Sequence, residues 1–403
     1  MNSGGWSKAR LGRMHDVMAG YVERGEVPGL VTLVSRRGET HVDVLGAQTL
    51  GGDEPMRRDT IFRIASITKS FAAAAVMMLV EECTLRLDEP VDKLLPELAG
   101  RRVLRRLDGP VDDTVPANRA ITVRDLLTFR LGLGMILGQP EVSPIQRAIA
   151  EQQLVGFAAP NRLADYGPDE WMRRLSTLPL MYQPGEKWLY NTGSYILGVL
   201  VARASGQPLE TFLRERLFGP LGMKDTSFSV PAEKLHRFPA AYHADPETGE
   251  LVLDEKAGNS EWSEEPSFPD AGGGLVSTVD DCFAFGRMML HKGKLGGERI
   301  LSRASVEAMT TDQLTPEQKA VSGFFPGYFD NRGWGLGVSM VTRRDDVSAS
   351  PGRFGWDGGT GTSWYTDPAE DMVAILLTQR GGFPLASGVY LDFWTSVYQA
   401  IDD

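Results

Sequence analysis

Strand-like segments lie at both ends of this chain, and helix-like segments fill its middle. Alternating side chains over residues 30–35 and 40–44 predict an antiparallel hairpin near the N-terminus. Residues 333–341, 361–366 and 372–378 predict three more strands, separated by glycine and Asp-Pro turns. If strands from both ends share one sheet, the chain between them forms an inserted unit. We therefore expect one antiparallel sheet to which both termini contribute.

The segments between these strands have the apolar spacing of helices. They are residues 123–129, 169–178, 195–204, 209–217 and 279–290. This order predicts an α/β (α+β) fold with two domains and a ligand-binding cleft between them. Residues 1–84 and 280–403 are expected to form the α/β domain, and residues 85–279 the mostly helical domain.

Three other segments need separate interpretation. Residues 71–80 are all apolar, a run too short to span a bilayer, and they predict a helix buried on all sides. Residues 100–119 mix prolines with charges that nearly cancel, which is typical of a solvated surface excursion. Residues 138–168 have no clear period, and two interpretations stay open for them, a flap over the cleft or an inert loop.

Composition excludes several classes of partner and cofactor. The chain has 42 basic and 53 acidic residues, a net charge of -11, which argues against a nucleic acid or an anionic membrane as partner. Cys83 and Cys282 lie far apart, and none of the five histidines forms a metal-binding pattern, so we expect no disulfide, metal or other cofactor. The N-terminal segment lacks the apolar core of a secretory signal, and we expect a cytoplasmic protein.

Ser66 and Lys69 are the first candidates for catalysis. The chain contains no GxSxG motif, so a serine activated by histidine is disfavoured. Ser66 follows a β-like run and opens the buried helix, and Lys69 lies one turn later on the same face. The helix N-terminus favours a developing oxyanion, and burial lowers the pKa of a lysine so that it can accept a proton. The alternative is an N-cap serine followed by a lysine whose stem alone is buried.

Six motifs in order carry a resemblance to a known family. They are ASITK with its alanine-rich helix from residue 65, LRLDEPVDKLLP from 85, ITVRDLLT from 121, QPGEKWLYNT from 183, GPLGMKDT from 219 and GGGLVSTVDD from 272. Together they resemble the serine β-lactamase and penicillin-binding-protein superfamily, in particular its class C-like branch. The resemblance covers residues 15–385, approximately. It implies a single catalytic module with a central antiparallel sheet flanked by helices and an inserted helical domain.

The resemblance also implies a general base. The family carries Tyr-x-Asn on the opposite wall of the cleft, and Tyr190 stands at the tyrosine position. Its phenol would be held as phenolate by Lys69, would activate Ser66 and would later protonate the leaving group. Here the asparagine comes one position early, as Asn191, and Thr192 takes the third place. For Asn191, contact with substrate and a structural cap or turn both stay open.

The family's third element is Lys-Thr-Gly or His-x-Gly, and here the matching place reads Trp356-Asp357-Gly358-Gly359. In the family this cation helps to hold the carboxylate of the substrate. Tryptophan offers apolar area and one N–H donor, and Asp357, if it faced the cleft, would repel an anion. Trp-x-Gly is similar to the family VIII carboxylesterases, which implies neutral acyl substrates. The N–H groups of Gly359 and Ser66 would form the oxyanion hole; the alternative is that the glycines only make a strand bulge.

These residues lead to a serine carboxylesterase that cleaves small-molecule esters with short-chain or neutral acyl groups through an acyl-enzyme on Ser66, with Lys69 and Tyr190 as general base. The alternatives on the same motifs are a β-lactamase or D-amino-acid peptidase or amidase, and an acyltransferase. A non-catalytic binding homologue would have lost the nucleophile or the base, whereas Ser66, Lys69 and Tyr190 are all present. The sequence favours no particular oligomeric state.

Overall fold

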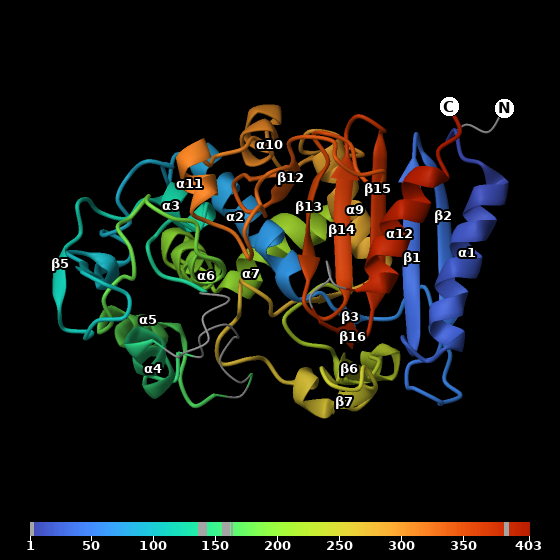
Figure 1. The fold of residues 1–403 in the computed structure, drawn as a ribbon, viewed down its shortest axis with the longest axis horizontal. Coiled ribbons are helices and arrows are strands. Elements are labelled where there is room, and N and C mark those ends of the chain that lie inside the picture. The colour runs from blue at the N-terminus through green and yellow to red at the C-terminus, as the bar shows by residue number, and fades with distance from the viewer. Residues whose placement is uncertain (1–3, 136–142, 155–161, 163, 383–386) are drawn as a thin grey trace.

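A seven-stranded antiparallel sheet, to which both ends of the chain contribute, forms one half of the molecule (Figure 1). The computed structural model describes residues 4–135, 143–154, 162, 164–382 and 387–403. In spatial order the strands are β11 (Arg332–Trp334), β12 (Ser339–Val341), β13 (Phe354–Gly358), β14 (Thr362–Asp367), β15 (Met372–Thr378), β1 (Gly29–Arg36) and β2 (Glu39–Gly46). The N-terminal hairpin joins the C-terminal strands through β1 and β15, where Leu33 pairs with Ile375. The predicted antiparallel sheet with strands from both ends of the chain is therefore confirmed.

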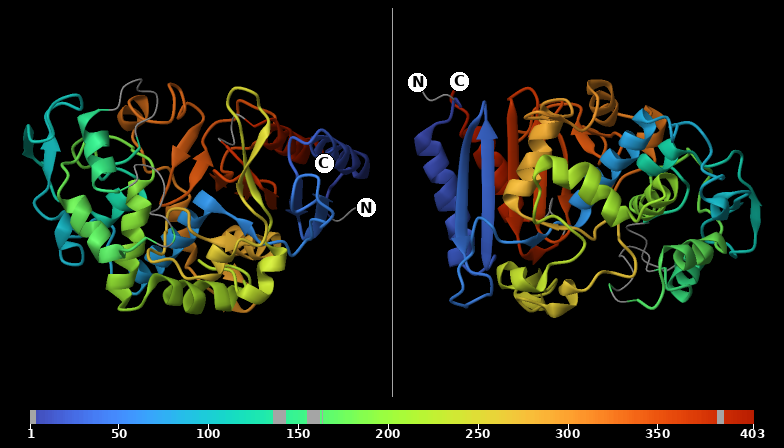
Figure 2. Two further views of the ribbon diagram at one scale, coloured as in Figure 1. Left: turned by 90° about the horizontal axis from the view of Figure 1, so that it is seen from below. Right: turned by 180° about the vertical axis from the view of Figure 1, so that it is seen from behind.

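Helices cover both faces of this sheet. The terminal helices α1 (Lys8–Glu23) and α12 (Gly388–Gln399) pack on one face, and α9 (Val279–Leu290) packs on the other (Figure 2). Helix α9 is among the helices predicted from the sequence, whereas α1 and α12 are not. In α1 the signal is present, because Leu11, Met14, Met18 and Tyr21 are buried and follow one another at spacings of three and four residues.

Helix α2 (Thr68–Glu81) lies between the sheet and the helical half of the molecule. All its residues from Thr68 to Leu79 are buried, which confirms the predicted helix without a solvent face. It packs against α6 (Thr192–Ser205), and the ring of Phe71 contacts that of Phe285 in α9 at a centroid distance of 4.3 Å. Side chains anchored on α2 are therefore held by packing from all directions.

The predicted helices of the middle segment are also present. They are α3 (Val123–Leu127), α5 (Pro168–Ser176), α6, and α7 (Leu209–Leu213), which continues as the π-helix η3 (Arg214–Phe218). The other helical elements are α4 (Pro144–Glu151), α8 (Gly219–Leu221), α10 (Arg303–Met309), α11 (Pro316–Ala320) and the 3-10 turns η1 (Ala65–Ile67), η2 (Pro96–Leu98), η4 (Ala232–Arg237) and η5 (Ser260–Ser263). Among the described residues, no helix is long and apolar enough to cross a bilayer.

Small sheets accompany these helices. They pair β3 (Phe62–Arg63) with β8 (Val276–Ser277), β4 (Arg102–Leu104) with β5 (Thr114–Pro116), β9 (Lys294–Leu295) with β10 (Glu298–Arg299), and β6 (Ala241–Ala244) with both β7 (Leu251–Glu255) and β16 (Arg380–Gly381). The division into two domains at residues 84 and 280 stays a prediction.

Three segments differ from expectation. Residues 333–341, predicted as one strand, form the hairpin β11–β12, because the chain turns back at Gly337, which has a φ of +82°. A side chain at Gly337 would also clash with the Cβ of Ala73 in α2. Residues 100–119, predicted as a solvated excursion, contain β4 and β5, and Val103 and Leu104 are buried. In the segment 138–168, α4 is a helix that was not predicted, and residues 138–142, 155–161 and 163 lie outside the described residues.

Candidate active site

Ser66 lies in the 3-10 turn η1, which continues directly into α2. The preceding residue, Ala65, has a φ of +43°, a left-handed conformation that costs an alanine about 1 kcal/mol. This strained turn leaves Ser66 partly exposed, while the following residues of α2 are buried. Lys69, one helical turn later, donates a hydrogen bond from Nζ to Ser66 Oγ at 2.8 Å. The predicted pairing of the two side chains is therefore present.

The amine of Lys69 is enclosed by protein. Its side chain is 2% exposed, and Nζ also donates to the carbonyl oxygen of Gly272. Nζ lies 4.7 Å from the centroid of the Tyr190 ring, over its face. Burial lowers the pKa of Lys69 to about 7, and the negative charge of Asp270 opposes this shift. Near neutral pH a substantial fraction of Lys69 is uncharged and can accept a proton.

Tyr190 lies just before α6, and its hydroxyl group connects two parts of the site. It is hydrogen-bonded to Ser66, and it accepts a bond from Nε1 of Trp356 at 2.8 Å. Burial raises the pKa of Tyr190 well above that of a free phenol, and these two hydrogen bonds act in the opposite direction. A neutral phenol is therefore favoured, which differs from the phenolate that the resemblance implies.

An aromatic cluster surrounds Tyr190. Its buried aromatic members are Phe129, Trp188, Tyr328, Phe329, Trp334 and Trp356, and Leu314 packs with them. Phe324, which is partly exposed, packs on this cluster with its ring centroid 5.0 Å from Tyr190 and 6.4 Å from Trp356. The environment of the phenol is thus apolar, which explains the direction of its pKa shift. The sequence analysis does not single out Phe324.

The turn that carries Gly358 and Gly359 is hydrogen-bonded to the chain just before Ser66. Thr362 Oγ1 donates to the carbonyl oxygen of Ile64 at 3.2 Å, two residues before Ser66, and a Cβ on Gly358 would clash with that same oxygen. Gly359 is exposed, and a Cβ built on it would meet no atom within 4 Å. The close approach of Gly358 requires glycine, whereas a side chain on Gly359 would have room.

Asn191 and Thr192 begin helix α6. Asn191 is its N-cap residue with a φ of +92°, and its amide nitrogen Nδ2 donates to the hydroxyl of Tyr195 at 2.6 Å. Thr192 is the first residue of the helix. The Asn191 amide is thus bonded to a side chain of α6 and does not cap the backbone N–H groups of that helix.

Asp357 does not face the cleft, contrary to its predicted place among the substrate-binding residues. Alternate residues of a strand point to opposite faces, so the side chain of Asp357 leaves β13 on the side opposite that of Trp356. Its carboxylate accepts hydrogen bonds from Ser363 at 2.7 Å, Tyr365 at 2.9 Å and Tyr390 of α12 at 3.2 Å. These bonds hold it on the α12 face of the sheet, and no repulsion of anionic substrates follows from it.

Asp270 is a residue of the site that sequence reasoning missed. It is 6% exposed, and Oδ1 accepts the backbone N–H of Gly272 at 2.6 Å. Burial raises the pKa of Asp270 to about 6, while the charge of Lys69 and backbone hydrogen bonds lower it. The signal in the sequence is an acidic residue just before the glycine run at 272–274.

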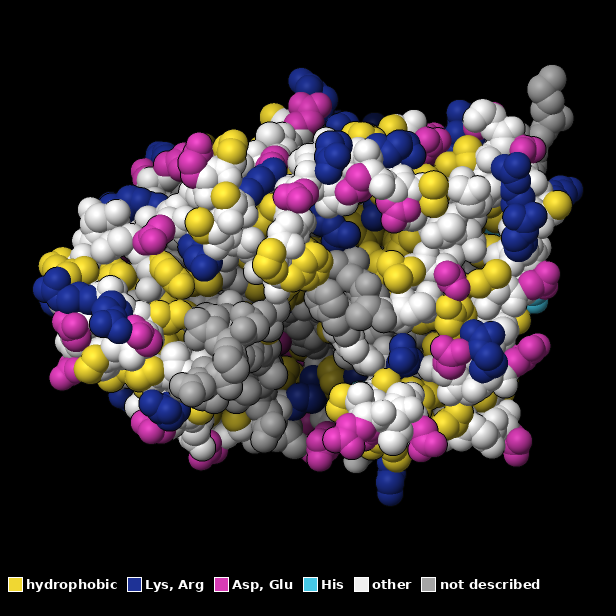
Figure 3. Space-filling view, viewed as in Figure 1, with side chains coloured by type: hydrophobic (Ala, Val, Ile, Leu, Met, Phe, Trp, Pro, Cys, Tyr) yellow, Lys and Arg dark blue, Asp and Glu magenta, His cyan; other side chains and the backbone are white. Residues whose placement is uncertain are grey.

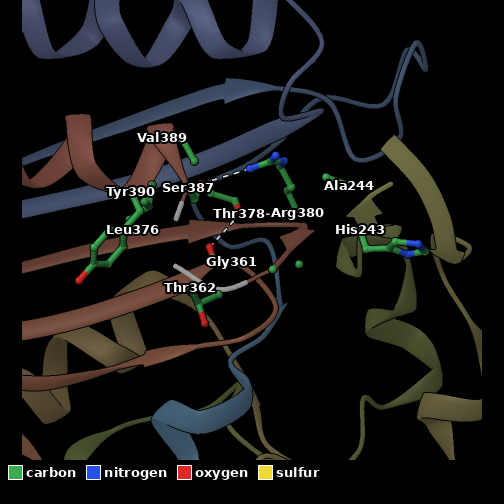
Figure 4. A pocket seen from close by; sticks show the side chains of 12 residues that line it. His243, Ala244, Gly361, Thr362, Leu376, Thr378, Arg380, Ser387, Val389 and Tyr390 are labelled. Carbon is green, nitrogen blue, oxygen red and sulfur yellow. Dashed lines mark hydrogen bonds between the residues drawn. The ribbon is translucent and has the colours of Figure 1, made fainter. Parts of the chain in front are cut away.

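Two cavities adjoin the turn at Gly359. One of about 170 Å³ lies at the ends of β14 and β15, where Arg380 Nη1 donates to Ser387 Oγ at 3.2 Å (Figure 4). The other, of about 220 Å³, is lined by Gly359 itself. Ser66, Lys69 and Tyr190 line neither cavity. On the face shown in Figure 3, the surface is hollowed near its centre, and basic and acidic side chains are interspersed.

Within the described ranges, no three side chains of His, Cys, Asp or Glu gather in a way that could hold a metal ion. The two cysteines are unpaired, with Cys83 exposed and Cys282 buried. The chemistry that this geometry can support is proton transfer among Ser66, Lys69 and Tyr190.

Comparison with known proteins shows the family to which the chain belongs. The family described as Beta-lactamase matches residues 14–390. Protein Rv1367c of Mycobacterium tuberculosis is 40% identical over 366 residues, which cover 89% of this chain and 87% of the relative. Esterase EstB of Burkholderia gladioli is 33% identical over 371 residues, 87% of this chain and 85% of the relative. Simvastatin synthase (LovD) of Aspergillus terreus shares the fold with a TM-score of 0.79 over 97% of this chain and 98% of that one, at 22% identity. The chain belongs to the β-lactamase family.

Proposed function

We propose that this protein is a serine carboxylesterase that cleaves neutral small-molecule esters through an acyl-enzyme on Ser66. Two contacts carry the proposal. Lys69 Nζ lies 2.8 Å from Ser66 Oγ, and the hydroxyl group of Tyr190 accepts a hydrogen bond from the indole of Trp356. The first pair makes a nucleophile, and the indole stands where a β-lactamase carries a cation.

Lys69 is the base in this reaction. Its amine takes the proton of Ser66 while Oγ attacks the ester carbonyl carbon, and the oxyanion that forms accepts hydrogen bonds from the N–H groups of Ser66 and Gly359. Tyr190 gives its proton to the departing alkoxide and regains one from Lys69. Lys69, neutral again, takes a proton from the water that attacks the acyl carbonyl carbon. It passes this proton to Ser66 Oγ as that oxygen leaves, which releases the acid and restores the resting site.

The assignment of proton roles follows from the two environments. Burial lowers the pKa of Lys69 to about 7 and raises that of Tyr190, so the amine is the better proton acceptor and the phenol the better donor near neutral pH. This division keeps the three residues expected from the sequence, and it makes Lys69 and Tyr190 neutral at rest in place of the ammonium and phenolate that the resemblance implies.

The substrate preference rests on Trp356. An indole provides apolar area and a single N–H, and that N–H already bonds to Tyr190. The side chain therefore offers no charge to a substrate carboxylate. Phe324 extends the apolar wall to the surface. A neutral acyl group fits these surroundings better than the anionic substrates of β-lactamases and D,D-peptidases.

Relatives support an ester substrate without fixing the acceptor of the acyl group. Two are named esterases, and others are named acyltransferases or putative D-alanyl-D-alanine carboxypeptidases. An acyltransferase would use the same acyl-enzyme and pass the acyl group to an alcohol in place of water.

The test is turnover of p-nitrophenyl butyrate with a stopped-flow record of the first turnover. We expect a burst of p-nitrophenol equivalent to the enzyme, and loss of about three orders of magnitude in activity for Ser66→Ala. Ser70→Ala is the matched control, because Ser70 is a buried serine of the same helix that donates to the carbonyl of Gly337. Full activity in Ser66→Ala would refute the proposal, as would faster turnover of nitrocefin than of every simple ester tried.

A second arm separates hydrolysis from acyl transfer. The same reaction is run with and without an added primary alcohol, and the acid and the new ester are quantified. We expect the acid to dominate in water alone. A rate that depends wholly on the alcohol would assign the protein to acyl transfer.

A further inference from the structure

Asp270 is a buried carboxylate next to the proposed base, and the reaction described above gives it no role. It lies in the loop that leads into β8, close enough to Lys69 that each charge shifts the pKa of the other. Its side chain is 6% exposed. An ionised carboxylate at such a place is costly unless hydrogen bonds and a counter-charge compensate for it.

The hydrogen bonds come from the loop itself. Oδ1 of Asp270 accepts the N–H of Gly272 at 2.6 Å, and the N–H of Gly273 also bonds to the carboxylate. The carbonyl oxygen of Gly272 in turn accepts a hydrogen bond from Lys69 Nζ. Gly272 therefore links the carboxylate to the amine.

The loop leaves little freedom at this link. A Cβ on Gly272 would lie 2.9 Å from Cε1 of Tyr195 and 3.0 Å from Oδ1 of Asp270. On the other side, the Cβ position of Gly273 is 3.8 Å from the backbone of Ala65, directly before Ser66. The carboxylate thus fixes a turn that is packed between α6 and the turn of the nucleophile.

The counter-charge is Lys69. Among the described residues no basic side chain, Lys69 included, forms an ion pair with Asp270 within 4.0 Å, and Lys69 is the cation whose charge lowers the pKa of Asp270. The titratable groups that face the pair are phenols, Tyr190 over Lys69 and Tyr195 near Asp270. When Ser66 gives up its proton, its O–H bond breaks and an N–H bond forms on Lys69. The resulting ammonium is then stabilised by the negative charge of Asp270, to which it is linked through Gly272.

We propose that Asp270 is a positioning residue of this site: its carboxylate anchors the loop whose Gly272 carbonyl holds the Lys69 amine against Ser66, and it supplies the negative charge that partners the lysine once it is protonated. The inference rests on the proposed function, since it assigns the base role to Lys69. Asp270 itself touches neither the substrate nor Ser66.

The test measures the rate at which a fluorophosphonate labels Ser66 covalently between pH 5 and 10. This reaction needs no ester turnover. Asp270→Asn keeps an oxygen for the N–H of Gly272 and loses the charge, so Lys69 becomes a weaker base. We expect the midpoint of the acid limb to fall by about one pH unit and the rate at high pH to fall as well. Asp270→Ala loses both contacts, and its rate at high pH should be at least about tenfold below wild type.

Asp281→Asn is the matched control. Asp281 is another buried aspartate, 7% exposed, whose carboxylate bonds to the N–H of Asp225 and the hydroxyl of Thr226, away from Lys69. It should leave the acid limb in place. Asp270→Glu keeps the negative charge but moves it. Its labelling rate should have the wild-type midpoint of the acid limb and a lower value at high pH. This variant tests the proposal even if Asp270→Asn fails to fold.

The outcomes separate the two proposals. If the wild-type serine is not labelled at any pH, the proposed function fails. If it is labelled and Asp270→Asn has the wild-type midpoint and rate, the role of Asp270 is refuted while the esterase stands. Unchanged kinetics in Asp270→Glu would refute the positioning role equally.

Discussion

The indole nitrogen of Trp356 donates a 2.8 Å hydrogen bond to the hydroxyl oxygen of Tyr190 across the site. Both side chains are at least nine-tenths buried, and their ring centroids are 5.6 Å apart. A donor aimed at the phenol oxygen stabilises the negative charge that appears there when Tyr190 releases its proton. Strand β13 thus assists the proposed proton donor with a neutral group.

Replacing Trp356 by phenylalanine should slow the reaction without changing the pH at which it begins. The substitution removes one neutral hydrogen bond, worth about 0.5–1.5 kcal/mol. We therefore expect the single-turnover rate of acylation by an alkyl butyrate, whose departing alkoxide needs the proton of Tyr190, to fall about two- to tenfold. Trp364→Phe is the control, since Trp364 is a fully buried indole of β14 whose ring packs against Phe285 of α9. Equal losses in both variants would mean that the effect comes from packing.

The rate of acylation should rise with pH through about 7. Burial lowers the pKa of Lys69 to about 7, and its neutral form is the base, so the active fraction is small below that pH and complete above it. Because burial raises the pKa of Tyr190, the phenol stays protonated and no alkaline loss is expected up to pH 9. Single-turnover rates from pH 5 to 9.5 measure this. An acid limb with a midpoint below about 5.5 would instead identify a carboxylate as the base.

Which parts could be predicted from sequence depends on the range of the interactions. Ser66 and Lys69 are one helical turn apart, so local spacing alone brings their side chains together. Tyr190 and Trp356 come from distant segments, and the family resemblance, not periodicity, marked them as partners. The orientation of Asp357 depends on the strand pairing of Asp357 with Ser363, and β13 was not among the strands predicted from alternation. Asp270 was missed because its role depends on a loop conformation at Gly272 that no short-range pattern encodes.

Gly358 and Gly359 should respond differently to alanine. A Cβ on Gly358 would clash with Thr362 Oγ1 and the carbonyl of Ile64, so the turn must move and the overpacking should cost about 1–3 kcal/mol. A Cβ on Gly359 meets nothing within 4 Å. We expect a clear fall in the thermal unfolding midpoint for Gly358→Ala and almost none for Gly359→Ala. If both variants unfold at the same temperature, the turn is less constrained than these contacts require.

Phe324 should determine how well long acyl chains are accepted. Its ring lies edge-on to Tyr190 at 5.0 Å and nearly parallel to Trp356 at 6.4 Å, with part of its surface open to solvent. An acyl chain that packs on this ring loses contact with water, and each buried methylene contributes about 0.8 kcal/mol. Truncation of the ring removes that contact for a long chain and leaves an acetyl group almost unaffected.

We therefore expect Phe324→Ala to lower the ratio of kcat/KM for p-nitrophenyl hexanoate over p-nitrophenyl acetate by about five- to tenfold, the equivalent of one or two methylenes. Phe325→Ala is the neighbouring control, because that ring is 49% exposed and packs edge-on to Tyr328 with a centroid distance of 5.4 Å. Its ratio should match the wild type. A ratio unchanged in Phe324→Ala would place the acyl chain elsewhere, whereas a fall in both variants would show that the whole segment from 324 to 328 forms the acyl-binding wall.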